Sequence, residues 1–212
     1  MINNKIIVCA TGESLRMIDI IKKDIEGCYA YIVNGNVGNL LLMYQDAFSN
    51  LKLRHIINRM VPSILDKDLY ISFNINELYF TVPEDRRHEV IKSIEKINSY
   101  NMDLKYYFVP PIVLDQYMKW NNITFYAMLM AIYHDNAKEI IIMGLDFWEG
   151  EYLTKSSTAH QKTLPMINDL YNRMKALCTY HKNIKFKLYT VSSKVKPLDN
   201  LEIIKVSKIS EG

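Results

Sequence analysis

Short apolar segments of the buried-strand type, which alternate with helical segments, restrict the fold of this chain most. The first, Lys5–Cys9, ends at the turn 10–14 (ATGES), and a helix with one apolar stripe is expected after it, N-capped by Ser14. The same order returns where a buried strand over 138–143 precedes a helix and a last strand over 185–191. Such alternation is typical of an α/β fold with a mostly parallel sheet flanked by helices.

The other predicted elements follow from the same patterns, which are weakest between residues 40 and 120. We expect further strands over 28–33, 69–73, 78–82 and 104–109, helices over 83–97, 123–133 and from 163 onward, and an irregular C-terminal tail. The length of 212 residues and the lack of an internal repeat favour one domain, residues 1–212.

Composition excludes several classes of protein. Hydrophobic residues make up 49% of the chain and charged residues 23%, which argues against a disordered chain, a collagen-like chain and a disulfide scaffold. Cys9, Cys28 and Cys178 form no CxxC pair, and we expect buried thiols in a reducing compartment. The N-terminus has no signal-peptide pattern and no apolar stretch is long enough to cross a bilayer, so we expect a cytoplasmic protein.

The net charge of +3 lies in the C-terminal tail, because seven lysines and three acidic residues follow Tyr180. A solvated surface explains this excess, and so does peripheral contact with an anionic membrane surface at the inner membrane. The lysines flank apolar residues between 201 and 206, a pattern that an edge strand with solvated lysines would also produce. No basic patch interleaved with aromatic residues occurs elsewhere, so nucleic acid is not an expected partner.

Polar residues follow three of the predicted strands, over 11–14, 34–39 and 144–160. Ligands of parallel α/β sheets bind outside the carboxyl ends of the strands, so we expect these loops to converge. Amides and a hydroxyl at a helix N-terminus, as in the first loop, favour an anion such as phosphate. The asparagine amides of the second loop both donate and accept hydrogen bonds, which suits a nucleobase or ribose. Ordinary turn and cap chemistry explains both loops as well.

The third loop contains Asp146 and His160. The carboxylate of Asp146 has the chemistry to bind a ribose hydroxyl, to orient a catalytic group, or to cap neighbouring amides as a purely structural residue. No DxD motif or second ligand at metal spacing accompanies it, so we predict no metal site. A neutral imidazole at His160 can remove a proton from an attacking hydroxyl, whereas an exposed bystander is the alternative.

Four segments occur in a fixed order along the chain: KIIVCATGESLRMID, ITFYAMLMAI with KEIIIMGLDFW, AHQKT, and IKFKLYTVS. Together they resemble the bacterial sialyltransferases of the Campylobacter lipooligosaccharide type, glycosyltransferase family 42. The segments are similar to that family's first strand, turn and helix, its central buried helix and following strand, the surroundings of its catalytic histidine, and a late strand.

The resemblance implies a single Rossmann-like (GT-A-like) domain that inverts at the anomeric carbon, needs no metal and uses no cofactor beyond its donor, a CMP-nonulosonate. The positions that match the family's donor-contacting segments are Thr11, Gly12, Ser14, Asn34, Gly35, Asn58, Thr124, Gly144 and Asp146. Trp148 and Tyr152 fall where the family has tyrosines that stabilise the departing phosphate, and His160 matches its general base. Residues 148–162 would form a lid loop that is shorter than the family's.

The expected function is therefore the transfer of sialic acid, or a related nonulosonic acid, from its CMP derivative to a hydroxyl of a glycan or glycolipid in lipooligosaccharide biosynthesis. Two alternatives stay open. One is a catalytically idle homologue that binds a nucleotide or glycan. The other is a pterin pyrophosphokinase-like transferase, which also opens with a strand, a G-S-L turn and a helix but needs magnesium. A homo-oligomer is compatible with all three readings.

Overall fold

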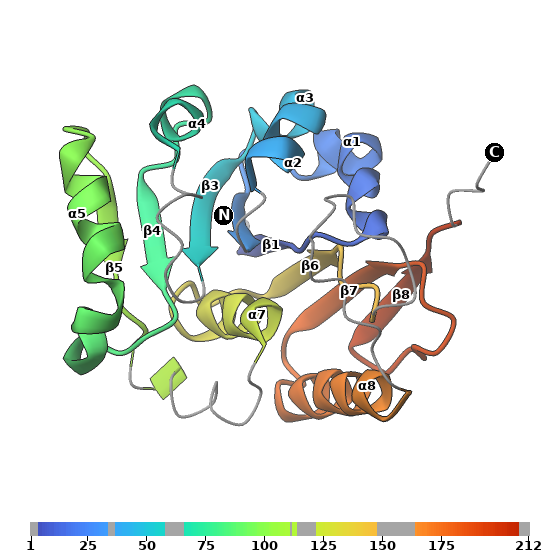
Figure 1. Ribbon diagram of the computed structural model, residues 1–212. Coiled ribbons are helices and arrows are strands. Elements are labelled where there is room, and N and C mark those ends of the chain that lie inside the picture. The colour runs from blue at the N-terminus through green and yellow to red at the C-terminus, as the bar shows by residue number, and fades with distance from the viewer. Residues whose placement is uncertain are drawn as a thin grey trace.

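One all-parallel sheet forms the centre of the structure, a computed structural model that describes residues 4–33, 37–57, 66–110, 112–113, 122–147 and 164–207 (Figure 1). Its eight strands lie in the order β5-β4-β3-β2-β1-β6-β7-β8. Their bounds are β1 Lys5–Cys9, β2 Tyr29–Val33, β3 Lys52–Ile57, β4 Glu77–Phe80, β5 Lys105–Tyr107, β6 Glu139–Met143, β7 Lys185–Thr190 and β8 Leu201–Lys205. The predicted α/β class is confirmed.

Helices cover both faces of this sheet, as Figure 1 shows. One face carries the 3-10 helices η1 (Glu13–Met17), η2 (Lys22–Asp24) and η4 (Glu84–Val90) and the α-helices α1 (Ile18–Ile21), α2 (Val37–Met43), α3 (Gln45–Phe48), α4 (Lys67–Ser72) and α5 (Ile91–Ser99). The other face carries α7 (Ile123–Tyr133) and α8 (Leu164–Tyr180). The sheet therefore separates two hydrophobic cores.

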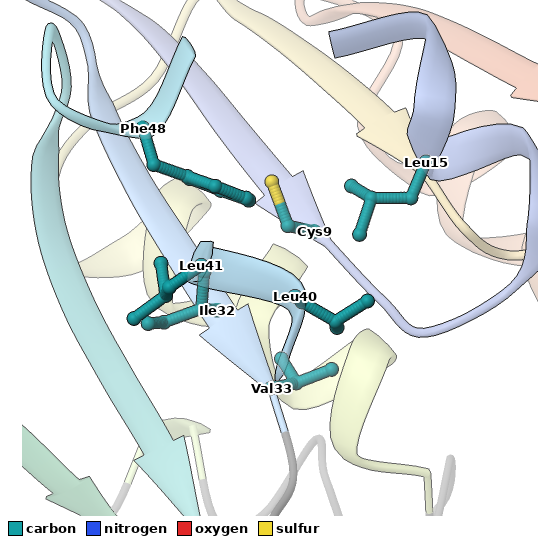
Figure 2. A pocket seen from close by; sticks show the side chains of 7 residues that line it. All are labelled: Cys9, Leu15, Ile32, Val33, Leu40, Leu41 and Phe48. Carbon is teal, nitrogen blue, oxygen red and sulfur yellow. The ribbon is translucent and has the colours of Figure 1, made fainter. Parts of the chain in front are cut away.

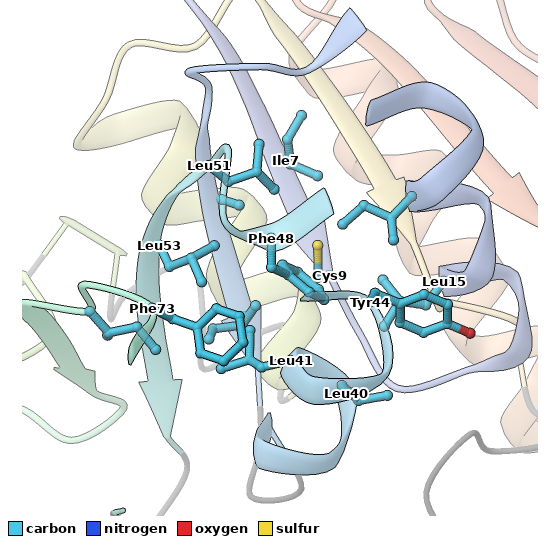
Figure 3. Packing of buried hydrophobic residues seen from close by; sticks show 14 of the residues in the cluster. Ile7, Cys9, Leu15, Leu40, Leu41, Tyr44, Phe48, Leu51, Leu53 and Phe73 are labelled. Carbon is cyan, nitrogen blue, oxygen red and sulfur yellow. The ribbon is translucent and has the colours of Figure 1, made fainter. Parts of the chain in front are cut away.

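Alternation along each strand supplies both cores, because successive side chains point to opposite faces of a sheet. Ile7 and Cys9 of β1 pack under α1, α2 and α3, where Figure 3 shows them among leucine and aromatic side chains. Ile6 and Val8 pack against α7 on the other face, and residues 123–132 of that helix are all buried. The three cysteines are buried as predicted, and burial raises the pKa of the Cys178 thiol to about 12.

The prediction of a strand over 69–73 is wrong, because this segment lies largely in helix α4. Asp66 is the N-cap of that helix, and its Oδ1 accepts hydrogen bonds from the amides of Asp68 at 2.9 Å and Leu69 at 3.4 Å. A cap of this kind satisfies amides that the first helical turn leaves without partners. The apolar run alone is too short to distinguish a strand from a helix.

The loop predicted over 34–39 is wrong in its second half, because α2 begins at Val37. The irregular tail is also wrong, since β8 pairs in parallel with β7 and forms one edge of the sheet. Leu201 is buried in one of the two cores and Val206 in the other, which agrees with the alternative that this segment is an edge strand. Lys205 donates from Nζ to the carbonyls of Ser192 and Val195.

None of the helices in the described ranges has the length and apolar character needed to span a membrane.

A charged network explains how β3 can carry arginine inside the sheet. The Arg54 guanidinium lies 2.6 Å from a carboxylate oxygen of Glu77 and 2.6 Å from one of Asp135. The Tyr31 hydroxyl donates to Asp135 at 2.7 Å, and the Tyr29 ring stacks 4.1 Å from the guanidinium carbon. Burial of the Asp135 carboxyl would raise its pKa, but hydrogen bonds with His134 and Tyr31 and the charge of Arg54 outweigh burial and lower it.

We expect this network to make the protein acid-sensitive. Because the native pKa of Asp135 is depressed, its stabilising effect is full above the ordinary carboxyl value, about 3.9, and is lost as pH falls through the lower native value. The free energy of unfolding of the wild type should therefore fall below about pH 4, while Asp135→Asn is less stable at pH 7 and falls less steeply. Urea unfolding between pH 3 and 7 measures this, with the exposed Asp103→Asn as control. Equal pH slopes for all three proteins would contradict the assignment.

Candidate functional site

The strand order changes direction between β1 and β6, which are neighbours in the sheet although β2 to β5 lie between them in sequence. In open α/β sheets such a reversal marks the crevice where ligands bind. The loops that leave the carboxyl ends of β1 and β6 are 10–14 and 144–147. The expected convergence of the first and third predicted loops is therefore confirmed at their described residues.

Hydrogen bonds hold these two loops together beyond the ends of their strands. The Ala10 amide donates to the Met143 carbonyl at 2.8 Å, and the Gly12 amide donates to the Gly144 carbonyl at 2.9 Å. The Gly144 amide donates to Ser14 Oγ at 2.9 Å. Ser14 is thus not the predicted N-cap, a position that Gly12 occupies without a side-chain cap. The buried Ser14 hydroxyl joins the two loops instead.

Asp146 joins a third strand to this pair. Its Oδ2 accepts from the Ser14 amide at 2.9 Å, and its Oδ1 accepts from the Val191 amide at 3.0 Å. The side chain is buried, with the residue only 5% exposed. Both carboxylate oxygens therefore bind backbone of this chain, which is the structural-cap alternative, and Asp146 fixes the ends of β1, β6 and β7 relative to one another.

The residues at the end of β7 were not predicted as part of the site. Thr190 and Ser192 are fully buried, and Thr190 Oγ1 donates to the Leu145 carbonyl at 3.3 Å and accepts from the Ser192 amide at 3.1 Å. The signal was present in the sequence, because Ser192 and Ser193 directly follow the strand predicted over 185–191. Ligands of parallel α/β sheets bind at loops that follow the carboxyl ends of strands, and the same reasoning applied after β7 would have identified these residues.

Glu13 is a further residue that sequence reasoning missed. It lies in the first turn of η1 and its side chain is 2% exposed. Its carboxylate lies 3.7 Å from the guanidinium of Arg16, which also donates to the Ser207 carbonyl just beyond β8. The ion pair offsets an acidic charge beside a turn expected to hold phosphate, and the hydrogen bond from Arg16 links that turn to the segment just after β8.

Two glycines allow the close approach of the loops. Gly144 adopts φ +75°, and a Cβ placed on it would lie 2.2 Å from the Ala10 carbonyl oxygen. A Cβ on Gly12 would lie 2.5 Å from Asp146 Oδ2 and from the Gly144 carbonyl oxygen. Side chains larger than hydrogen are excluded at both positions unless the backbone moves.

Thr124 lies in the first turn of α7, where Asn122 Oδ1 accepts from its amide at 2.9 Å, and it is 4% exposed. The helix runs into β6 at its C-terminus, so its first turn lies toward the carboxyl edge of the sheet. The remaining predicted site residues lie outside the described residues and stay predictions: Asn34, Gly35, Asn58, Trp148, Tyr152 and His160, together with the lid 148–162.

An apolar hollow of about 10 Å³ lies near this edge, between β1, β2, η1, α2 and α3. Figure 2 shows the Cys9 sulfur between the side chains of Leu15 and Phe48. Burial raises the pKa of the Cys9 thiol, so the thiolate is disfavoured. A hollow of one-water size that is lined by apolar side chains has no room for a nucleobase and belongs to the core.

Among the described residues, no group of three or more His, Cys, Asp or Glu side chains is arranged so that it could hold a metal ion. The chemistry that this edge offers is that of amides, hydroxyls and two buried carboxylates, those of Glu13 and Asp146. Backbone amides at a helix start favour an anion, and hydroxyl and amide groups suit sugar or base hydroxyls.

Comparison with known proteins gives little beyond this geometry. No family model matches the chain, and no curated protein matches it. Among solved structures, the Campylobacter jejuni sialyltransferase CstII in complex with the substrate analogue CMP-3FNeuAc is similar at 15% sequence identity and a TM-score of 0.44. The match covers 98% of this chain and 92% of that one.

Proposed function

We propose that the chain is an inverting, metal-independent glycosyltransferase that moves sialic acid or a related nonulosonic acid from its CMP derivative to a glycan hydroxyl. The observation that supports this most is the meeting of the Thr11–Ser14 turn with the Gly144–Asp146 loop at the reversal of the strand order. The ordered resemblance of four sequence segments to family 42 sialyltransferases supplies the donor and the reaction type.

In the proposed reaction, the acceptor hydroxyl attacks the anomeric carbon from the side opposite CMP. A bond to the acceptor oxygen forms, the bond to the phosphate oxygen breaks, and the configuration inverts. His160 takes the proton of the acceptor hydroxyl as that bond forms. The Trp148 indole N–H and the Tyr152 hydroxyl stabilise the charge that develops on the departing phosphate, because the Gly12 and Ser14 amides of the 11–14 turn already donate within the chain.

The direct test is CMP release from several CMP-nonulosonates in the presence of glycan acceptors, with and without EDTA. We expect release that depends on the acceptor and continues in EDTA, because the chain supplies the stabilising donors itself. CMP binding without release would favour the idle homologue. Pyrophosphate transfer from ATP that requires magnesium would favour the pterin pyrophosphokinase-like alternative.

The donor site has its own test in Asn34→Ala. Loss of one amide that contacts the nucleotide should weaken CMP binding about 3–10-fold, since one hydrogen bond contributes roughly 0.5–1.5 kcal/mol. Asn98→Ala, on the exposed side of α5, serves as the control. Asp146→Ala should weaken CMP binding and also lower the melting temperature, because two backbone amides lose their acceptor. Calorimetry that finds unchanged affinity in both site variants would place the nucleotide elsewhere.

A further inference from the structure

We propose that the opposite edge of the sheet holds a second binding site, for a single acidic sugar residue such as the carboxylate-bearing end of a glycan. An open hollow of about 230 Å³ lies there, at the amino ends of β6 and β7 and the C-terminal ends of α7 and α8. Its lining is Ile132, Asn136, Ala137, Lys138, Tyr180, His181, Lys182, Asn183 and Ile184. The candidate donor site lies at the carboxyl ends of the same strands, so the two sites are distinct.

The charge of this hollow is positive. Lys138 and Lys182 are exposed, no carboxylate lines the hollow, and in the described part of the chain neither ammonium group has an ion-pair partner. The nearest acidic residues in sequence, Asp135 and Glu139, are engaged elsewhere: Asp135 with Arg54, and Glu139 with the lysines at positions 5 and 187. The two ammonium groups are therefore available to a ligand carboxylate.

Helix C-termini normally repel anions, because their last carbonyls carry partial negative charge. Here the protein itself supplies donors to some of the carbonyls at these helix ends and just beyond them. The Asn200 side-chain amide donates to the carbonyls of Cys178, His181 and Ile184 at 2.9, 3.1 and 3.0 Å. At the end of α7, the Met130 carbonyl accepts from the amides of His134 and Asp135. The repulsion at both helix ends is thus reduced.

The other lining groups favour a sugar over a bare anion. Asn136 and Asn183 are exposed, and each amide can donate to one hydroxyl and accept from another, as vicinal sugar hydroxyls require. Tyr180 is 73% exposed, and its ring offers an apolar face to the C–H groups of a pyranose. The His181 ring is packed at 5.0 Å from the Tyr180 ring and 5.5 Å from the Tyr133 ring, which holds this wall in place.

The size of the hollow also limits the ligand. Sites for drug-sized molecules measure about 300–1,000 Å³, and this one is smaller. One sugar ring with its carboxylate is therefore the unit recognised, while any further residues of a glycan would extend into solvent.

Methyl glucuronoside and methyl glucoside are a matched pair of probes, because they differ only in having a carboxylate or a hydroxymethyl group. Chemical-shift titration of the whole protein should show millimolar binding of the glucuronoside and at least tenfold weaker binding of the glucoside. Lys138→Ala with Lys182→Ala should weaken glucuronoside binding at least tenfold, and Asn183→Ala about threefold. The control pair Lys92→Ala with Lys175→Ala, on exposed faces of α5 and α8, should bind as the wild type does.

Three results would overturn the proposal: equal binding of the two glycosides, unchanged glucuronoside binding in the Lys138 and Lys182 double variant, or acetate binding as tightly as the glucuronoside. CMP binding measured on the same variants keeps this test separate from the proposed transferase activity. The double variant should bind CMP normally, and Asn34→Ala should bind the glucuronoside normally.

Discussion

Gly144→Ala should lower the free energy of unfolding by about 3–4 kcal/mol and the melting temperature by about 6–16 °C. Two effects add at this position. A left-handed backbone costs a residue with a Cβ about 1–2 kcal/mol, and Gly144 has φ +75°. In addition, the new methyl group would lie 2.2 Å from the Ala10 carbonyl oxygen, so the loops after β1 and β6 must separate. Thermal and urea unfolding measure the loss.

Gly27→Ala isolates the first effect, the cost of the left-handed backbone. Gly27 has almost the same backbone conformation, with φ +72°, but no atom lies within 4 Å of a Cβ placed on it. It should lose only the conformational part, about 1–2 kcal/mol. Equal losses for the two variants would show that the close approach of the two loops contributes nothing to stability. Because the same approach shapes the proposed donor site, Gly144→Ala should also abolish measurable CMP binding, whereas Gly27→Ala should not change it.

His160→Ala should reduce transfer at least about 10²-fold while CMP binding changes little. A sugar hydroxyl is a weak nucleophile near neutral pH and needs its proton removed as the new bond forms. The wild-type rate should rise with pH through a group that titrates between about 6 and 7, because the base acts in its neutral form. Initial rates of CMP release across pH 5 to 9, with saturating donor, measure both effects.

The matched control is His88→Ala, at an exposed position of η4, which should keep the wild-type rate and pH profile. A His160 variant that keeps most of the transfer activity would remove the catalytic assignment, whatever its pH profile. Loss of CMP binding together with transfer would instead assign His160 to the donor site.

Strands that form continuous apolar runs were predictable, whereas β3, with two polar residues at its centre, was not. The segments Lys5–Cys9 and Glu139–Met143 are continuous apolar runs, the pattern that is typical of buried parallel strands. Strand β3 was missed because its sequence, KLRHII, has two polar residues at its centre. Both polar side chains can be buried because residues far away in the sequence pair with them. Arg54 forms ion pairs with Asp135 and Glu77, and His55 Nδ1 lies 2.8 Å from the Tyr70 hydroxyl. Partners this far away in sequence leave no local pattern.

The position of the site was predictable from the sequence, but the hydrogen bonds within it were not. Polar residues after buried strands identified Gly12, Ser14, Gly144 and Asp146, and the structure brings all four together. Which of their atoms bind one another depends on the register between β1 and β6, which no local pattern reveals. The Asp146 carboxylate, with three possible roles in sequence, accepts two backbone amides because that register places the Ser14 and Val191 amides beside it.

The pairing of β1 with β6 also sets the order in which the chain can fold. Strands β1 to β4 each pair with the next strand in sequence, so the half of the sheet from β1 to β5 can form while the rest of the chain is still being synthesised. The contact between Ser14 and Asp146 joins residues 132 positions apart, and such long-range closure is slow because its entropy cost comes before its contacts form. The candidate site therefore appears only when β6 docks, and ligand binding would report the completion of folding.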